Sequence, residues 1–162
     1  MPSFIGFVPT TQEDIDNLFN LAPVSSSDVV YDLGSGDGRL LFAALDKGAG
    51  RAVGIEIDPE RVREAREMAR SRNLNDRVTF LEADIMDVSL TEATVVFCYL
   101  CSAASAALKP KFEAELKPGT RVVMETFAVP GWIPDQTASG GFVYYYWYTD
   151  FYLYVMPPRS SE

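Results

Sequence analysis

The sequence predicts an α/β fold, with a mostly parallel sheet and helices on both of its faces. Short apolar runs typical of strands alternate with amphipathic runs typical of helices over residues 28–127. A glycine-rich turn at 34–38 follows the first of these strands. The aromatic run 142–156 has no room for a helix and predicts an antiparallel hairpin. Alternation of strands and helices favours parallel strands, because the crossover helices cover the faces of the sheet.

The elements follow in order along the chain. Residues 10–22 predict a capped helix, since Thr10 or Thr11 precedes Glu13 and Asp14 at the start of an apolar stripe. The expected elements after it are strand 28–33, helix 38–48, strand 51–58, helix 59–73, strands 77–84 and 93–100, helix 103–116 and strand 119–127.

The C-terminal run 142–156 is interpreted as two strands with Thr149-Asp150 between them. Its aromatic density would also suit a platform on which nucleic-acid bases stack. The net charge of −9, from 14 basic and 23 acidic side chains, disfavours nucleic acid as a partner. We therefore expect aromatic residues that alternate between core and surface of an edge hairpin.

Length and composition predict one domain, 1–162, with 48% hydrophobic and 23% charged residues. No apolar run approaches the roughly 20 residues that span a bilayer, and the N-terminus lacks the features of a signal peptide. We expect a cytoplasmic monomer without membrane insertion. Cys98 and Cys101 are expected as two buried or half-buried thiols. No metal site is expected, because zinc needs more ligands and the chain has no histidine.

The turn at 34–38 raises the question of its ligand. Its glycines allow a sharp backbone turn and close approach of a ligand: Gly34, Gly36 and Gly38. A P-loop is excluded because no Lys-Ser/Thr pair follows, and Arg39 stands where a dinucleotide fingerprint has its third glycine. Asp37 and Asp32 would repel a pyrophosphate and favour an ammonium or sulfonium. S-adenosylmethionine carries both.

Acidic and apolar residues end the next two strands. Glu56 closes the second strand, where a carboxylate can accept hydrogen bonds from both hydroxyls of a ribose. Asp84 ends the third strand and can accept from an adenine amino group, while Ile57 and Ile85 can enclose the ring. Glu56 alone does not separate S-adenosylmethionine from NAD. The turn, Glu56 and Asp84 together favour S-adenosylmethionine.

Several motifs together resemble a known family. They are "FVPT", "DLGSGDGR", "GIEIDPERV", "ATVVFCYLCSA", "LKPKFEAELKPGTRVV" and "PGWIP". The chain resembles the seven-β-strand class I methyltransferases over nearly its whole length. More narrowly, it is similar to the small protein-lysine methyltransferases, which include broad-specificity archaeal enzymes and the mitochondrial enzyme that methylates the c-ring protein of ATP synthase.

The resemblance implies a Rossmann-like sheet of seven strands in the order 3-2-1-4-5-7-6, in which strand 7 is antiparallel and strands 6 and 7 form the 142–156 hairpin. It also implies that residues 7–10, in an N-terminal cap of 1–27, fold over the methionine end of the cofactor, and that 97–100 lines the acceptor channel. The expected cofactor contacts are Thr10, Asp32, Gly34, Gly36, Asp37, Gly38, Glu56, Ile57, Asp84, Ile85 and Tyr99. Archaeal relatives tend to carry Ser-His-Glu-Phe where this chain has Met124-Glu125-Thr126-Phe127, which leaves open whether the acceptor is the same.

A lysine acceptor must lose a proton before it attacks, and its pKa of about 10.4 makes the neutral form about 4 to 5 kcal/mol uphill near pH 7. No histidine is present to act as base. We expect Phe7, Tyr99 and Trp132 to hold the amine by cation–π contact, and Glu125 to orient it or receive its proton. The expected partner is a protein with exposed lysines. A small-molecule N- or O-methyltransferase and a non-catalytic S-adenosylmethionine-binding module stay open as alternatives.

Overall fold

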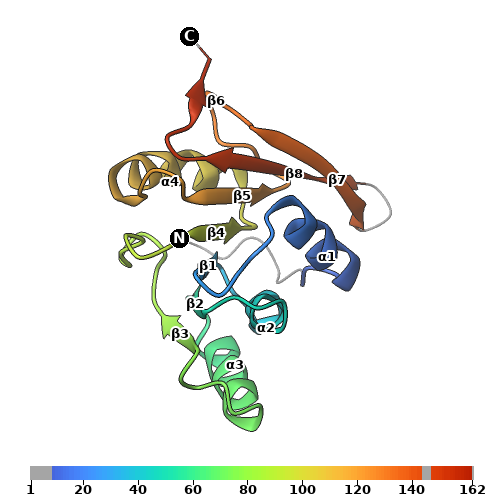
Figure 1. The fold of residues 1–162 in the computed structure, drawn as a ribbon, viewed down its shortest axis with the longest axis vertical. Coiled ribbons are helices and arrows are strands. Elements are labelled where there is room, and N and C mark those ends of the chain that lie inside the picture. Colours follow the sequence, from blue (N-terminus) through green and yellow to red (C-terminus); the bar gives the residue numbers. More distant parts are fainter. Residues whose placement is uncertain (1–8, 144–146, 162) are drawn as a thin grey trace.

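A seven-stranded sheet forms the centre of the structure, a computed structural model that describes residues 9–143 and 147–161 (Figure 1). Its strands lie in the order β3-β2-β1-β4-β5-β8-β7. Their bounds are β1 Val29–Leu33, β2 Arg51–Glu56, β3 Val78–Glu82, β4 Val95–Cys98, β5 Arg121–Glu125, β7 Gln136–Val143 and β8 Trp147–Val155. The first five pair in parallel, and β8 is antiparallel to both β5 and β7. The predicted strand order is confirmed.

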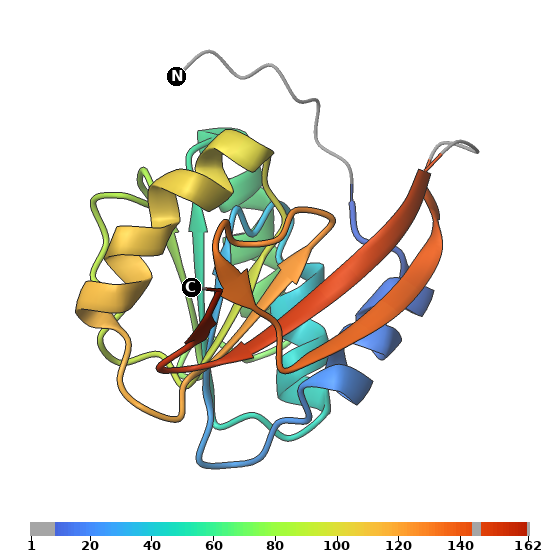
Figure 2. The same cartoon turned by 90° about the horizontal axis from the view of Figure 1, so that it is seen from above.

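Helices cover both faces of the sheet, as Figure 2 shows. The described helices are α1 Gln12–Leu21, α2 Arg39–Asp46, α3 Pro59–Ser71 and α4 Ser102–Glu115. The first three bury apolar side chains in one core with alternate residues of the strands, and α4 packs on the opposite face in a second core. No described helix has the length and apolar character that crossing a bilayer demands.

The predicted helix ends agree with the structure to within two residues, because local chemistry sets them. The Thr11 hydroxyl accepts a hydrogen bond from the Asp14 amide and caps α1. The Asp58 carboxylate caps α3 in the same way, and Pro59 occupies the first helical position. Helix α2 begins directly after Gly38, so the glycine turn and the helix form one continuous unit.

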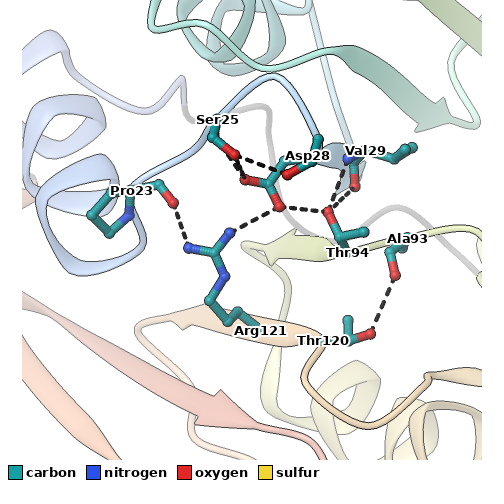
Figure 3. Close-up of polar contacts among 9 residues, drawn as sticks. Pro23, Ser25, Asp28, Val29, Ala93, Thr94, Thr120 and Arg121 are labelled. Atoms are coloured by element: carbon teal, nitrogen blue, oxygen red, sulfur yellow. Dashed lines mark hydrogen bonds and ion pairs between the residues drawn. The ribbon is translucent and has the colours of Figure 1, made fainter.

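A polar network around Asp28 fixes the amino ends of the central strands (Figure 3). The Thr94 hydroxyl donates to Asp28 Oδ1 over 2.8 Å, and the Arg121 guanidinium pairs with the same oxygen over 3.0 Å. Burial opposes the ionised form of Asp28, but hydrogen bonds from Ser25 and Thr94 and the charge of Arg121 hold its pKa below the usual value. This network joins β1, β4 and β5 at the end of the sheet opposite the glycine turn.

The C-terminal hairpin differs from the prediction. Strand β7 already begins at Gln136, and Thr149 and Asp150 lie inside β8 rather than between the strands. The first strand was missed because Gln136–Val143 carries polar residues and a Gly-Gly pair instead of apolar alternation, and its register with β8 shifts between Ser139 and Phe142. A small sheet of β6 Trp132–Ile133 and β9 Arg159–Ser160 was not predicted either.

Candidate active site

Three buried carboxyl groups lie along the carboxyl ends of neighbouring strands. Glu56 ends β2, Asp32 lies near the end of β1, and Glu125 ends β5; they are 8%, 9% and 4% exposed. Along each strand they alternate with residues of the α4 core, so all three face the side of α1, α2 and α3. Tyr99 follows β4 directly, between β1 and β5. The predicted site residues of four strands therefore share one edge of the sheet, and the three carboxyl groups share one face.

The glycine turn has the backbone geometry that its sequence predicts. Gly34, Gly36 and Gly38 have φ angles of 85°, 56° and 84°, in the left-handed region. A Cβ on Gly38 would lie 2.6 Å from Cζ of Phe80, so no larger residue fits there without movement. The amides of Gly34 and Ser35 both donate to the Ile55 carbonyl. These contacts hold the turn against the end of β2.

Glu56 binds the turn from the neighbouring strand. One carboxylate oxygen accepts from the Gly36 amide over 2.9 Å, and the other accepts from the amides of Ile57 and Asp58 over 3.1 and 3.0 Å. A carboxylate has about four acceptor positions, so about one remains for a ligand hydroxyl. This arrangement fits a ribose hydroxyl at the position that the sequence assigned to it.

The negative charge at the turn is distributed differently from the prediction. Arg39 binds both carboxylate oxygens of Asp37, with a shortest contact of 2.7 Å. Burial opposes ionisation, but the hydrogen bonds and charge of Arg39 still lower the pKa of Asp37. Arg39 therefore balances part of the negative charge of Asp37, a pairing that the expected doubly negative pocket did not include.

Asp32 carries the main electrostatic signal at the turn. Burial first, and then the charges of Glu56 and Asp37, raise its pKa to about 7. A nearby cation would favour the ionised form and so bind well. Asp32 and Glu56 thus supply buried acceptors that fit a ligand with a positive charge and ribose hydroxyls, as S-adenosylmethionine has.

The residues predicted to enclose the adenine lie at the ends of β2 and β3. Ile57 leaves 64% of its surface exposed, which suits a side chain that covers a ring. Ile85 is half-buried against the α4 core. Asp84 is exposed, and its carboxylate accepts from the Met86 amide over 2.9 Å. Their contact with a bound adenine stays a prediction.

Glu125 lies in an unusual environment at the end of β5. Burial first, then the charges of Asp14 and Asp32, raise its pKa to about 8, although a hydrogen bond from the Thr10 hydroxyl opposes this rise. The next residue, Thr126, has a φ of 72°, and the Phe127 amide donates to the Glu125 carbonyl across it over 2.9 Å. A β-branched residue in the left-handed region is strained.

The other expected acceptor residues have different outcomes. Trp132 is 5% exposed, packs on Phe112 and Tyr154, and donates its indole N–H to Glu113 over 3.1 Å. It therefore belongs to the α4 core, on the face of the sheet opposite Glu125, and the structure does not bring it to the acceptor site. The alternation of side chains along β5 does not continue through the loop before Trp132, so the sequence could not indicate which face of the sheet this side chain meets. Phe7 lies outside the described residues.

Cys98 and Cys101 are free thiols, as predicted. Cys98 is buried, and burial first, then the charge of Asp32, raises the pKa of its thiol. Sequence reasoning gave no role to Asp14, which is buried in α1 although it carries a charge. A signal was present, since Asp14 lies four residues before Leu18 and so shares the apolar face of the helix.

Comparison with known proteins agrees with this geometry. A family model described as the ANTKMT methyltransferase domain matches residues 32–136. A protein-lysine N-methyltransferase of Saccharolobus islandicus (strain REY15A) is 41% identical over 133 residues, which cover 82% of this chain and 83% of that protein. A lysine N-methyltransferase of Mus musculus, named for its ATP synthase substrate, is 32% identical, but the match spans only 54% of that longer protein.

A solved structure is similar over nearly the whole chain. The crystal structure of an RNA methyltransferase from Salinibacter ruber with S-adenosyl-L-homocysteine has a TM-score of 0.85 and 37% identity, and the match covers 96% of this chain and 97% of that one. Fold and site therefore define an S-adenosylmethionine-dependent methyltransferase. The chain belongs to the family of the ANTKMT methyltransferase domain.

Proposed function

We propose that this protein methylates the ε-amine of lysine in other proteins, acting as a cytoplasmic monomer of one domain. The observation that carries the proposal is Glu125, a carboxyl group 4% exposed at the end of β5, two strands from the glycine-turn strand β1. A buried carboxyl group can bind an ammonium when ionised and can accept its proton. The relatives named as lysine methyltransferases from an archaeon and from mouse support the same acceptor.

The chain's own residues supply the cofactor site. When bound, S-adenosylmethionine supplies a methyl group on a positively charged sulfur, which an amine lone pair can displace in line. Glu56 accepts from a ribose hydroxyl, while Asp32 stabilises positive charge beside the turn. The residues that would contact the adenine are Ile57, Asp84 and Ile85. Thr10 lies near Glu125, where its hydroxyl donates to the carboxyl over 3.4 Å.

Glu125, once ionised, makes direct transfer of the lysine proton to a protein carboxylate less unfavourable. Its pKa of about 8 lies about 2.4 units below that of a free lysine, so proton transfer to it costs about 3 kcal/mol. An ordinary glutamate would require about 8 kcal/mol for the same transfer. Tyr99, between Asp32 and Glu125 in strand order, offers a ring for cation–π contact with the ammonium. Phe7 keeps the same proposed role.

RNA is the second candidate acceptor, because the Salinibacter ruber protein is described as an RNA methyltransferase. The net charge of −9 and the buried carboxyl row disfavour a polyanion here. A small-molecule acceptor is the third candidate. A module that binds cofactor without turnover is the fourth.

Transfer of a tritiated methyl group separates these candidates. The acceptors are a ten-lysine peptide with a blocked amino terminus, the matched ten-arginine peptide, and total RNA. We expect label on the lysine peptide alone, in steps of 14 Da by mass spectrometry, since each methylation adds a CH₂. Label on RNA and not on lysine, or cofactor binding without any transfer to the peptide or to unfolded cell protein, would overturn the proposal.

A further inference from the structure

We propose that Asp14 and Glu125 form a carboxyl pair that binds the acceptor amine and takes up its proton, with the Thr149 hydroxyl as a third ligand of the amine. Asp14 and Thr149 then join Glu125 as residues of the acceptor site. This inference rests on the proposed function, because it presumes an amine as acceptor.

Packing of α1 on the hairpin brings Asp14 to the end of β5. Asp14 is 2% exposed, and its Oδ1 lies 2.6 Å from the position of a Cβ built on Gly140 in β7. The same position is 2.7 Å from the ring of Phe151, which is the register partner of Glu125 on β8. Only a glycine at 140 leaves room for the Asp14 carboxylate. Because Phe151 lies beside this position and pairs with Glu125, Asp14 of the helix and Glu125 of the strand approach the same part of the sheet.

Thr149 provides an independent indication of a ligand. It is 1% exposed, and among the described residues its buried Oγ1 has no hydrogen-bond partner. Thr149 precedes Phe151 by two residues on β8, so both side chains face α1. A buried hydroxyl without a partner is unfavourable, and a hydrogen bond from an amine or ammonium would satisfy it.

The surroundings of Glu125 are acidic or neutral on every element packed against it. Their titratable groups are Asp14 of α1, Asp32 of β1, Cys98 of β4, Tyr99 after it, and Asp150 and Tyr152, which flank Phe151 on β8. Arg39 at the start of α2 already binds Asp37, and it donates to the Thr10 carbonyl over 3.4 Å. No lysine or arginine of the described residues pairs with Glu125, so an incoming ammonium supplies the missing positive charge.

The proposed step conserves atoms and charge. The lysine ammonium binds between Asp14 and Glu125 after Glu125 has released its own proton to solvent, and one N–H proton of the ammonium then passes to a Glu125 oxygen. The freed nitrogen lone pair forms the N–C bond as the methyl–sulfur bond breaks, and that electron pair remains on sulfur. The product is a methylated ammonium, and Glu125 later releases its proton to solvent. Asp14 takes up no proton in this step and holds the amine.

Three substitutions test the pair: Asp14→Asn, Glu125→Gln and Thr149→Val. Asp16→Asn is the matched control, because Asp16 lies on the exposed face of α1 and pairs with Lys47. The readouts are calorimetric affinity for S-adenosylhomocysteine and the pH profile of kcat/KM on the blocked ten-lysine peptide. Glu125→Gln is expected to lower kcat/KM about 100-fold or more. Asp14→Asn is expected to lower it about 10-fold, and Thr149→Val about 3-fold, with cofactor affinity within about twofold.

The pH profile separates a chemical role of Asp14 from mere packing. Removal of its negative charge lowers the pKa of Glu125, so the acidic limb of the profile should move to lower pH by about half a unit or more. Asp16→Asn should leave both the limb and kcat/KM unchanged. An acidic limb that does not move in Asp14→Asn would overturn the pair, however much activity falls.

A second measurement needs neither turnover nor cofactor. Carbon-13 NMR of labelled glutamate follows the titration of Glu125, assigned by its loss in Glu125→Gln. The pair predicts a titration well above the ordinary 4.5 in the wild type and a lower one in Asp14→Asn, or in Asp14→Ser if that variant does not fold. Titration near the ordinary value in both proteins would overturn it. Methylation of the lysine peptide by the wild type tests the proposed function alone. If the wild type does not methylate the peptide, the proposed function and the carboxyl pair both fail. If it does and the Glu125 titration is ordinary, only the pair fails.

Discussion

The two halves of the active-site edge differ in how well their polar groups are satisfied. In the cofactor half, around β1 and β2, Glu56 accepts from three backbone amides. In the acceptor half, around β5 and β8, the side-chain carboxyl of Glu125 accepts one long hydrogen bond of 3.4 Å among the described residues. The hydroxyl oxygens of Thr126 and Thr149 are buried there without a hydrogen-bond partner among the described residues, whereas the cofactor half has one such oxygen, Ser35 Oγ. Thr126 also has a positive φ of 72°.

This difference indicates two ways of building a binding site. The cofactor half is preorganised, because its main acidic ligand already holds the glycine turn in position. The acceptor half stores unfavourable contacts that a cationic amine would relieve. Such contacts cost free energy in the unliganded protein and favour its partner.

Loss of Glu56 should produce the largest effect on cofactor binding, since it removes both a ligand and the support of the turn. Glu56→Ala is expected to weaken S-adenosylhomocysteine binding about 100-fold, or about 2.7 kcal/mol, by calorimetry. Glu82→Ala is the matched control: Glu82 is the register partner of Glu56 on β3 but is exposed. An affinity within threefold of the wild type in Glu56→Ala would show that the turn forms and binds without its carboxylate.

Two buried carboxyl groups, one in each half, should make the unliganded protein less stable as pH rises. Asp32 and Glu125 have native pKa values of about 7 and about 8, above their ordinary values of 3.8 and 4.5. The native state therefore holds more protons than the unfolded state between about pH 4 and pH 8. The free energy of unfolding falls through this range by at most about 1.4 kcal/mol per pH unit for each group.

Urea unfolding at several pH values between about 5 and 8 measures this slope. Glu125→Gln carries no titrating proton, so its slope should be shallower than that of the wild type between about pH 5 and pH 8, where native Glu125 keeps a proton that the unfolded chain has lost. Equal slopes in the two proteins would place the native pKa of Glu125 near its ordinary value.

Much of the cofactor half was predictable because local sequence determines it. The turn at 34–38 joins a strand and a helix that are contiguous in the chain, and Glu56 ends the next strand. The pairing of Asp37 with Arg39 was missed even though the residues are two apart, because turn geometry rather than a helical spacing brings them together.

The acceptor half depends on contacts between distant parts of the chain. Asp14 reaches the end of β5 only because α1 packs on β7 beside Gly140, and the polar sequence of that strand did not indicate a strand at all. Trp132 was expected in the channel but lies on the other face of the sheet. No local pattern of residues predicts on which face of the sheet the side chains of a strand will lie when a loop precedes that strand.

The smallest expected effect comes from relieving the strain at Thr126. Thr126→Gly removes a β-branched side chain from the left-handed region, which stabilises the folded state by about 1 to 2 kcal/mol. The greater chain entropy of glycine in the unfolded state opposes this gain by about 0.5 to 1 kcal/mol. We expect the free energy of unfolding in urea to rise by about 1 kcal/mol. Gly38→Ala is the converse control: its φ of 84° and the approach of Phe80 to 2.6 Å should make it destabilising. A loss of stability in both variants would mean that Thr126 is held by favourable contacts, and the acceptor half would then be preorganised like the cofactor half.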